Sequence, residues 1–272
     1  MELLSLFQYD FMLRALAAGL ITAVIAPMVG VFLVTRRYSF MADTLSHVSL
    51  AGVAAGYLTN TQPIVMAVIV SVLTALCVEQ LRSKKKVLGE SALAMFLSGG
   101  LAVAAVLLSA SKGLNVNISS VLFGSITTVT KTDIMIIAIL GTLVLATIAT
   151  LYKELVAISL DEELALSSGI PVVAINRIFV VLAAVTVSLS MRIVGTLLIG
   201  ALMVIPVLAA MQLRKSFFAT MSIAVAVSVL SVLIGLMVSY EAGLSSGGTI
   251  VLVSMAFFFL MTLYRTVSGS QR

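Results

Sequence analysis

Apolar residues along this chain occur in long runs that are separated by short polar connections. A helix that crosses a membrane needs about 20 predominantly apolar residues. Nine runs are candidates on that basis, although several are short: 15–34, 43–60, 63–81, 89–110, 133–152, 172–190, 193–212, 217–239 and 248–264. The stretch 118–130 is too short and polar to span and predicts an interfacial or re-entrant helix. We therefore expect an all-α polytopic membrane protein, with eight or nine transmembrane helices plus short interfacial and coupling helices, forming one domain over residues 1–272.

Composition and charge support this class. The chain is 61% hydrophobic and 10% charged, whereas soluble domains carry about 25% charged residues. The net charge of +5 is no sign of a nucleic-acid partner, because the cations lie between the apolar runs. Four cations fall at one set of junctions (Arg14, Lys112, Lys131 and Arg192) and the other twelve fall at the alternate junctions. This bias places the twelve in the cytoplasm, the N-terminus outside and the C-terminus inside. If one candidate span is re-entrant, the side of one terminus reverses.

The sequence lacks the motifs of the common hydrolases. A single histidine rules out a His-Glu-x-x-His zinc site, and there is neither a Gly-x-Ser-x-Gly elbow nor a Gly-x4-Gly-Lys-Ser/Thr phosphate loop. A lone cysteine, Cys77, rules out an internal disulfide and any Cys-rich metal site. The chain is thus not expected to be an enzyme, to hydrolyse nucleotide through such a loop, or to hold a cofactor of its own.

One pair of ionisable residues lies inside an apolar run. Asp43 and His47 are four residues apart, so they share a helix face. At 1.5 Å per residue they lie about 9 Å and about 15 Å past Arg37, which brings His47 near the bilayer midplane. Ionisable groups at that depth suggest function, and imidazole with carboxylate suits Zn²⁺, Mn²⁺ or Fe²⁺. Two copies of the chain on a two-fold axis would supply four ligands. The structural alternative is that Asp43 caps the second span and His47 hydrogen-bonds a neighbouring helix.

The longest cytoplasmic connection, about residues 153–171, has a helical centre. Ser159 with Glu162 three residues later predicts a capping box, Gly169 ends the helix and Pro171 opens the next span. A short acidic helix on the cytoplasmic face is either a docking element or a plain amphipathic connector, and the spacing alone does not separate these.

Four ordered blocks of the sequence resemble the permeases of metal-ion ABC transporters, most closely the zinc-uptake members. The first block contains Arg36-Arg37, then Ala42-Asp43-Thr44-Leu45-Ser46-His47, then Gly52-Val53-Ala54; it departs from the family pattern at Ala42, where glycine is common. The other blocks lie within 161–171, 194–210 and 244–251. The resemblance covers nearly the whole chain.

This resemblance implies a bacterial inner-membrane, multi-pass permease that forms a homodimer with a translocation path along the dimer axis. It implies a separate cytoplasmic ATP-binding subunit docked at the coupling loop, where Asp161, Glu162, Ala165 and Gly169 match the family. An extracytoplasmic metal-binding protein is implied on the other face. In the family the signature Asp and His, here Asp43 and His47, handle the metal.

The leading hypothesis is therefore the membrane subunit of an ATP-driven importer of a divalent metal, with zinc as the expected cargo. The same machinery carrying manganese, iron or a metal chelate is the first alternative. A secondary carrier coupled to an ion gradient and a non-transport membrane scaffold are alternatives of other classes.

Overall fold

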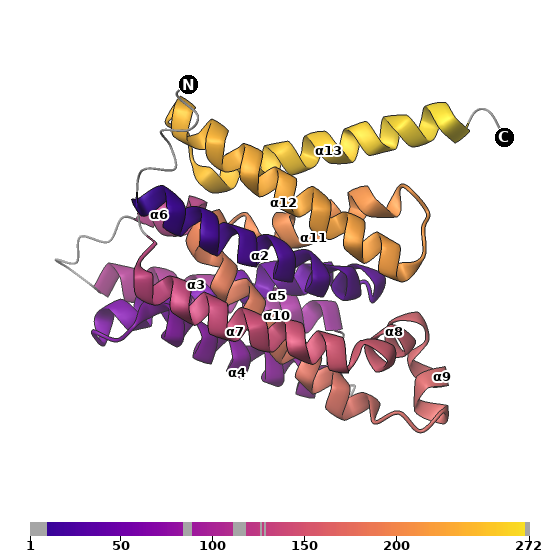
Figure 1. The fold of residues 1–272 in the computed structure, drawn as a ribbon. Coiled ribbons are helices and arrows are strands. Elements are labelled where there is room, and N and C mark those ends of the chain that lie inside the picture. The colour runs from indigo at the N-terminus through magenta and orange to yellow at the C-terminus, as the bar shows by residue number, and fades with distance from the viewer. Residues whose placement is uncertain (1–9, 84–88, 111–117, 126, 128, 270–272) are drawn as a thin grey trace.

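The computed structural model describes residues 10–83, 89–110, 118–125, 127 and 129–269, and these form helices joined by short turns with no strand among them. Figure 1 shows the long helices side by side, with α8 and α9 at the end of the bundle where α13 finishes. The helices are α2 (Asp10–Thr35), α3 (Ser39–Leu58), α4 (Pro63–Ser83), α5 (Gly89–Ala110), α6 (Ile118–Phe123), α7 (Lys131–Thr150), α8 (Tyr152–Leu160), α9 (Glu162–Ser167), α10 (Val172–Val194), α11 (Ile199–Met211), α12 (Phe217–Ala242) and α13 (Ser246–Gly269). The predicted all-α class is confirmed.

Seven helices in the described part of the chain are long and apolar enough to cross a membrane. They are α2, α4, α5, α7, α10, α12 and α13. The predicted count of eight or nine is therefore not confirmed, because the helices at two candidate spans, 43–60 and 193–212, do not meet both conditions. The stretch 118–130 contains the short helix α6 and no span, as predicted.

The two exceptions have different physical causes. Helix α3 has the length of a span but carries Asp43 and His47, and 13 of its 20 residues are buried against other helices. A helix enclosed by protein can be more polar than one that faces lipid. Helix α11 has only 13 residues, because the backbone turns at Gly195 and helix resumes only at Ile199. Gly195 has φ +86°, a conformation that glycine adopts without steric cost.

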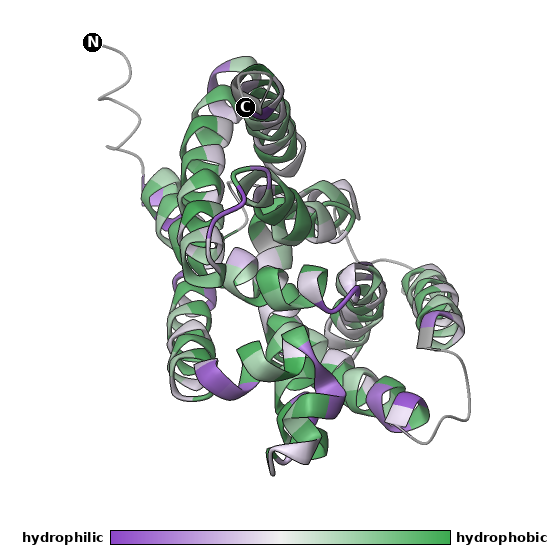
Figure 2. Ribbon diagram, turned by 90° about the vertical axis from the view of Figure 1, so that its right-hand side faces the viewer, coloured by the Kyte–Doolittle hydropathy of each residue, from purple (hydrophilic) through white to green (hydrophobic). Residues whose placement is uncertain are grey.

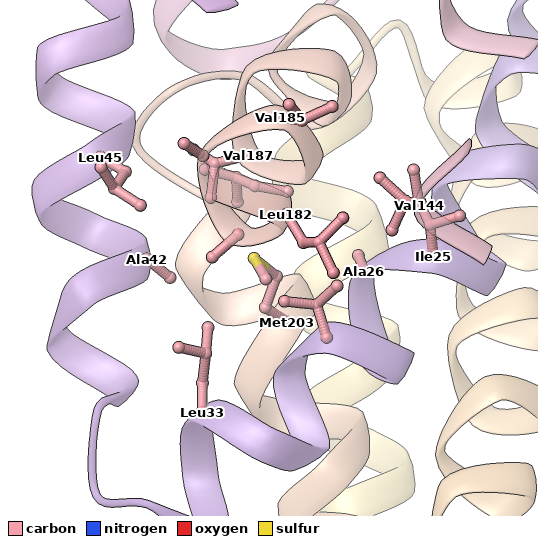
Figure 3. Close-up of a cluster of buried hydrophobic side chains, with 14 of the residues drawn as sticks. Ile25, Ala26, Leu33, Ala42, Leu45, Val144, Leu182, Val185, Val187 and Met203 are labelled. Carbon is pink, nitrogen blue, oxygen red and sulfur yellow. The ribbon is translucent and has the colours of Figure 1, made fainter. Parts of the chain in front are cut away.

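The helices differ strongly in how much protein surrounds them. The apolar windows of α2 and α10 are 67% and 72% buried, whereas that of α5 is 17% buried. Figure 3 shows side chains from α2, α3, α7, α10 and α11 meeting in one buried cluster, with Ala42 and Leu45 of α3 directed toward it. Figure 2 shows mostly hydrophobic helices with hydrophilic segments at the end that carries α8 and α9. Thus one face of α3 contributes to the core of the bundle, and other parts of the helix pack on α4 and α5.

Small residues let α3 and α4 pack with almost no gap. A Cβ added to Gly52 would lie 2.6 Å from the Ala67 Cα, and one added to Gly56 would lie 2.8 Å from the Pro63 Cα. Backbones can approach this closely only where side chains are absent. The close approach at Gly52 and Gly56 joins α3 and α4 into one tight hairpin.

Candidate functional site

Asp43 and His47 are the two accessible positions in the otherwise buried middle of α3, from Met41 to Ala54. Every other residue from Met41 to Ala54 is buried, whereas these two are partly accessible. Their spacing of four residues puts both side chains on the same face, one turn apart. His47 lies near the middle of the helix. The structure thus brings this predicted pair together on an open face.

The neighbour of Asp43 is the start of α11. Gly200 lies in the first turn of that helix, and a Cβ added there would collide with the Asp43 carboxylate Oδ1. The missing side chain therefore makes room for the carboxylate. The N-terminus of a helix carries unpaired N–H groups and a partial positive charge, which favour a carboxylate beside it. Nothing in the sequence pattern alone marks Gly200 as a partner of Asp43.

The side chains of Asp43 and His47 form no hydrogen bond in the described part of the structure. The His47 Nδ1 atom is buried with no hydrogen-bond partner, although buried polar groups in proteins are normally paired. Helix α3 begins at Ser39 after Tyr38, so Asp43 lies in the second turn and does not cap the helix. No group of three or more His, Cys, Asp or Glu side chains is found among the described residues. The structural alternative, in which Asp43 caps the helix and His47 hydrogen-bonds a neighbouring helix, is therefore not observed among the described residues.

The predicted coupling loop forms two short helices, not one. Asp161 separates α8 from α9 with an extended backbone, and its carboxylate accepts a hydrogen bond from the Leu164 N–H at 2.9 Å. The predicted Ser159–Glu162 capping box is therefore wrong. Ser159 lies inside α8, where its hydroxyl donates to the Leu155 carbonyl and accepts from Arg36. The predicted stop at Gly169 is confirmed, because its φ of +82° ends the helical path.

The coupling-loop residues named from the family resemblance make contacts that fix the shape of α8 and α9. Ala165 is 3% exposed and packs inward, Asp161 is the cap, and Glu162 bonds to other helices. Asp161, Glu162 and Gly169 are nevertheless exposed, and the outward surface also includes Leu160, Leu164 and Leu166, which are 71%, 65% and 62% exposed. Sequence reasoning missed these leucines. Their signal was an apolar side chain repeated within an acidic, polar connector.

A polar network ties this element to the start of α3. Arg36 donates to the Ser159 hydroxyl and to the Asn176 Oδ1, each at 2.8 Å, and to the Leu155 carbonyl at 3.3 Å. Its guanidinium also lies 4.5 Å from the ring centroid of Phe179. Burial lowers the pKa of Arg36 to about 10, and the negative charge of Glu162 opposes that change. Arg36 therefore stays cationic at neutral pH with its donors engaged.

The network continues to α9 and α4. The Asn176 amide donates to Glu162 at 3.1 Å, and Glu162 lies 3.6 Å from Arg82. Arg82 in turn donates two hydrogen bonds to Glu79, at 2.9 and 2.8 Å. Sequence reasoning did not connect Glu162 with Asn176 or Arg82, because these contacts join different helices.

Comparison with known proteins identifies the family. The model of the ABC 3 transport family matches residues 8–265. The chain belongs to this family. The predicted resemblance is confirmed, and the protein is a multi-pass membrane protein of a transport system.

Several family relatives match over almost their full length. The chain is 34% identical over 256 residues to a probable metal transport system membrane protein of Treponema pallidum, covering 94% of this chain and 96% of that one. It is 28% identical to the manganese transport system membrane protein MntC of Halalkalibacterium halodurans, with 97% and 90% covered. It is also 28% identical to the high-affinity zinc uptake system membrane protein ZnuB of Haemophilus influenzae, with 94% and 98% covered.

A solved structure agrees with this fold. The structure titled PsaBC from Streptococcus pneumoniae in complex with Fab superposes with a TM-score of 0.85 at 26% identity, and 97% of each chain is covered. The helix arrangement described above is therefore shared with a known member of this structural class.

Proposed function

We propose that this chain is the permease subunit of an ATP-driven importer that moves a divalent transition metal, with zinc as the first candidate. The observation that carries the proposal is the Asp43–His47 pair, whose side chains lie partly accessible and without hydrogen bonds in the otherwise buried middle of α3. A permeation site has to release its ion, so ligands that are not locked to the protein suit transport. Carboxylate and imidazole are ligands for Zn²⁺, Mn²⁺ and Fe²⁺.

A second copy of the chain completes this proposal. Two ligands do not form a closed metal site, since Zn²⁺ takes four. Two permeases related by a two-fold axis would bring two Asp43 and two His47 side chains together if their open α3 faces meet. The apolar core on the other side of α3 leaves that open face as the place where a path can run.

The ATP-binding subunit docks on α8 and α9 in this proposal. Leu160, Leu164 and Leu166 provide an apolar surface, and the acidic residues Asp161 and Glu163 lie beside it in the sequence. Exposed apolar side chains rimmed by charge are typical of protein interfaces. The matched partner surface is an apolar groove with basic residues at its edge. An extracytoplasmic metal-binding protein would deliver the ion at the opposite end of the bundle.

The metal is the least determined part of the proposal. Relatives named for zinc and for manganese are equally identical to this chain, and one named for iron is 27% identical. Overall identity therefore does not choose between them. Zinc comes first because the 41–52 signature is most similar to that of zinc-uptake permeases.

Transport by the reconstituted complex tests this function. The chain is placed in liposomes with its ATP-binding subunit and the metal-binding protein, and uptake of radioactive Zn²⁺ is measured with excess Mn²⁺ or Fe²⁺ as competitor. We expect uptake that requires ATP and that unlabelled Zn²⁺ suppresses best. Suppression by Mn²⁺ or Fe²⁺ instead would reassign the cargo. Gradient-driven uptake by the chain alone would replace the importer with a secondary carrier.

A further inference from the structure

We propose that Arg36, Asn176 and Glu162 are positioning residues that couple movement of α9 to the gap between Asp43 and α11. This inference rests on the proposed function, because it concerns how the partner subunit reaches the metal pair. None of the three residues touches the metal in this proposal. Each acts through the helix that it holds.

The first step is that the network grips the metal-bearing helix at its cytoplasmic end. Arg36 lies three residues before α3 and seven before Asp43. Its three donors are fixed by two helices, α8 through Ser159 and Leu155, and α10 through Asn176. The planar guanidinium holds several acceptors in fixed directions, which a lysine ammonium does not do. A displacement of α8 therefore displaces the start of α3.

The second step is that α9 pulls on both arms of one hairpin. Glu162 reaches Asn176, and through it Arg36, at the start of α3. The same carboxylate lies 3.6 Å from Arg82 in the last turn of α4. The Arg82 guanidinium also lies 5.3 Å from the ring centroid of Tyr38, the residue that precedes α3. One side chain of α9 thus connects to the cytoplasmic ends of both α3 and α4.

The third step is that the hairpin moves as a unit. The backbones of α3 and α4 touch at Gly52 and Gly56, so the two helices cannot slide toward one another. Ser49 of α3 and Ser188 of α10 share a hydrogen bond of 2.9 Å about halfway along α3. In this proposal the hydrogen bond is the point about which the α3–α4 hairpin tilts. A pull at the cytoplasmic end then tilts Asp43 relative to α11, where Gly200 leaves the carboxylate free of a side chain.

The network contains no spare partner for its central member. Asn176 is 4% exposed, accepts from Arg36 and donates to Glu162. Replacing it with alanine breaks the link on both sides while leaving the charges of Arg36 and Glu162 in place. Asn176→Ala is therefore the most selective single substitution for breaking the link between Arg36 and Glu162.

Spin-label distances within the assembled complex test the coupling without using metal. Labels are attached at Leu58, at the end of α3, and at Leu197, just before α11; both are exposed, and Cys77 is replaced by serine. Labelled chains are diluted with unlabelled ones so that the distance within one chain dominates. We expect vanadate trapping with ATP to change this distance in the otherwise native chain. Asn176→Ala is expected to lose most of that change while nucleotide is still trapped.

A matched control is available at the same end of the bundle. The Gln212 Oε1 accepts a hydrogen bond of 2.8 Å from Arg265, which is another arginine–carboxamide pair but outside this network. Gln212→Ala should keep the full distance change. Metal transported per ATP should fall about tenfold in Asn176→Ala, within the usual range of coupling free energies, and stay unchanged in Gln212→Ala. Unchanged values in Asn176→Ala would overturn the inference.

A double-mutant cycle separates coupling from general damage. If Asn176 acts through its contact with Arg36, the double alanine variant should lose no more of the distance change than Arg36→Ala alone. Additive losses would overturn the inference. Glu162→Gln keeps the oxygen that accepts from Asn176, so it should retain more of the distance change than Asn176→Ala. The native complex failing to transport any metal would instead overturn the proposed function, and the label distances would still report on the network.

Discussion

Arg36 and His47 lie on either side of the start of α3, eleven residues apart, and their polar groups differ sharply in hydrogen bonding. At Arg36, the donors of the guanidinium are met by a hydroxyl, an amide oxygen and a carbonyl, and Phe179 covers one face. At His47, a buried ring nitrogen has no partner among the described residues. The same helix segment therefore joins a fully bonded site to one that is left open.

The difference indicates what each site is for. A half-buried charge with three hydrogen bonds to two helices is costly to disturb and fixes the elements around it. A polar pair without hydrogen-bond partners costs free energy in the folded state, and this cost supports our proposal that a ligand binds there. The first site suits a mechanical joint and the second suits an ion in transit. Each prediction below tests one side of this contrast.

The largest effect is expected at the open pair. Asp43→Asn or His47→Ala should reduce metal uptake about 100-fold, in line with the loss of a metal ligand. Thermal stability should change little, because no protein hydrogen bond is lost. Uptake by the reconstituted complex and thermal unfolding in detergent measure the two quantities. The control is Ser49→Ala on the buried side of α3, which breaks the bond to Ser188. It should lower stability but retain metal binding, and full uptake by both site variants would disprove the assignment.

The bonded site should show the reverse pattern in stability. Arg36→Ala leaves the Asn176 amide oxygen without its donor, and the Ser159 hydroxyl and the Leu155 carbonyl each lose one partner while keeping their bond to each other. The cost should be about 2 kcal/mol, since unsatisfied buried groups cost roughly 1–3 kcal/mol each and water can reach this half-buried site. Arg36→Lys should recover only part of it. Denaturation of the purified permease provides the measurement. A stability loss no greater than that of Asp43→Asn would remove the contrast between the two sites.

A smaller effect is expected where the two helices face each other. Gly200→Ala adds a Cβ that overlaps the Asp43 carboxylate. The carboxylate is the end of a flexible side chain, so it can turn away at little cost in stability. Uptake should nevertheless fall about tenfold, because a ligand misplaced by about 1 Å loses most of its function. Gly99→Ala is the matched control, since nothing lies within 4 Å of that position. Equal uptake by both variants would show that Asp43 does not need this space.

Much of this arrangement follows from local sequence, and the parts that do not share one cause. The apolar runs predicted the helices, and the spacing of Asp43 and His47 predicted their common face. The predicted span count is not confirmed at α3 and α11, because hydropathy does not tell whether a helix is surrounded by lipid or by protein. Helix α3 is polar because it is enclosed, and α11 is short because the chain turns at Gly195.

The coupling element shows the same limit at the level of single residues. Ser159 has the sequence signature of a cap, but Arg36, which lies 123 positions away in the chain, uses its hydroxyl instead. Asp161 then caps α9 from an extended conformation. Gly200 was just as hidden, since its role depends on Asp43 of another helix. Contacts between distant positions decide these roles, and a single sequence does not display them.

The smallest effect is expected at Gly169, which ends the turn after α9 and so fixes where Glu162 enters the bonded network. Its φ of +82° is strained for any residue with a Cβ, although nothing lies within 4 Å of the added atom. Gly169→Ala should therefore destabilise the permease by about 1 kcal/mol through the backbone alone. Gly99→Ala should have the opposite sign, a gain of about 0.5–1 kcal/mol, because alanine favours a helix interior. Measured unfolding free energies of the two variants give the comparison directly. If Gly169→Ala weakens ATP-driven uptake more than this loss of stability explains, the Arg36 network depends on the exact path of the turn at Gly169. If uptake is unchanged, the network tolerates small shifts of that turn and is held together by the hydrogen bonds of Arg36.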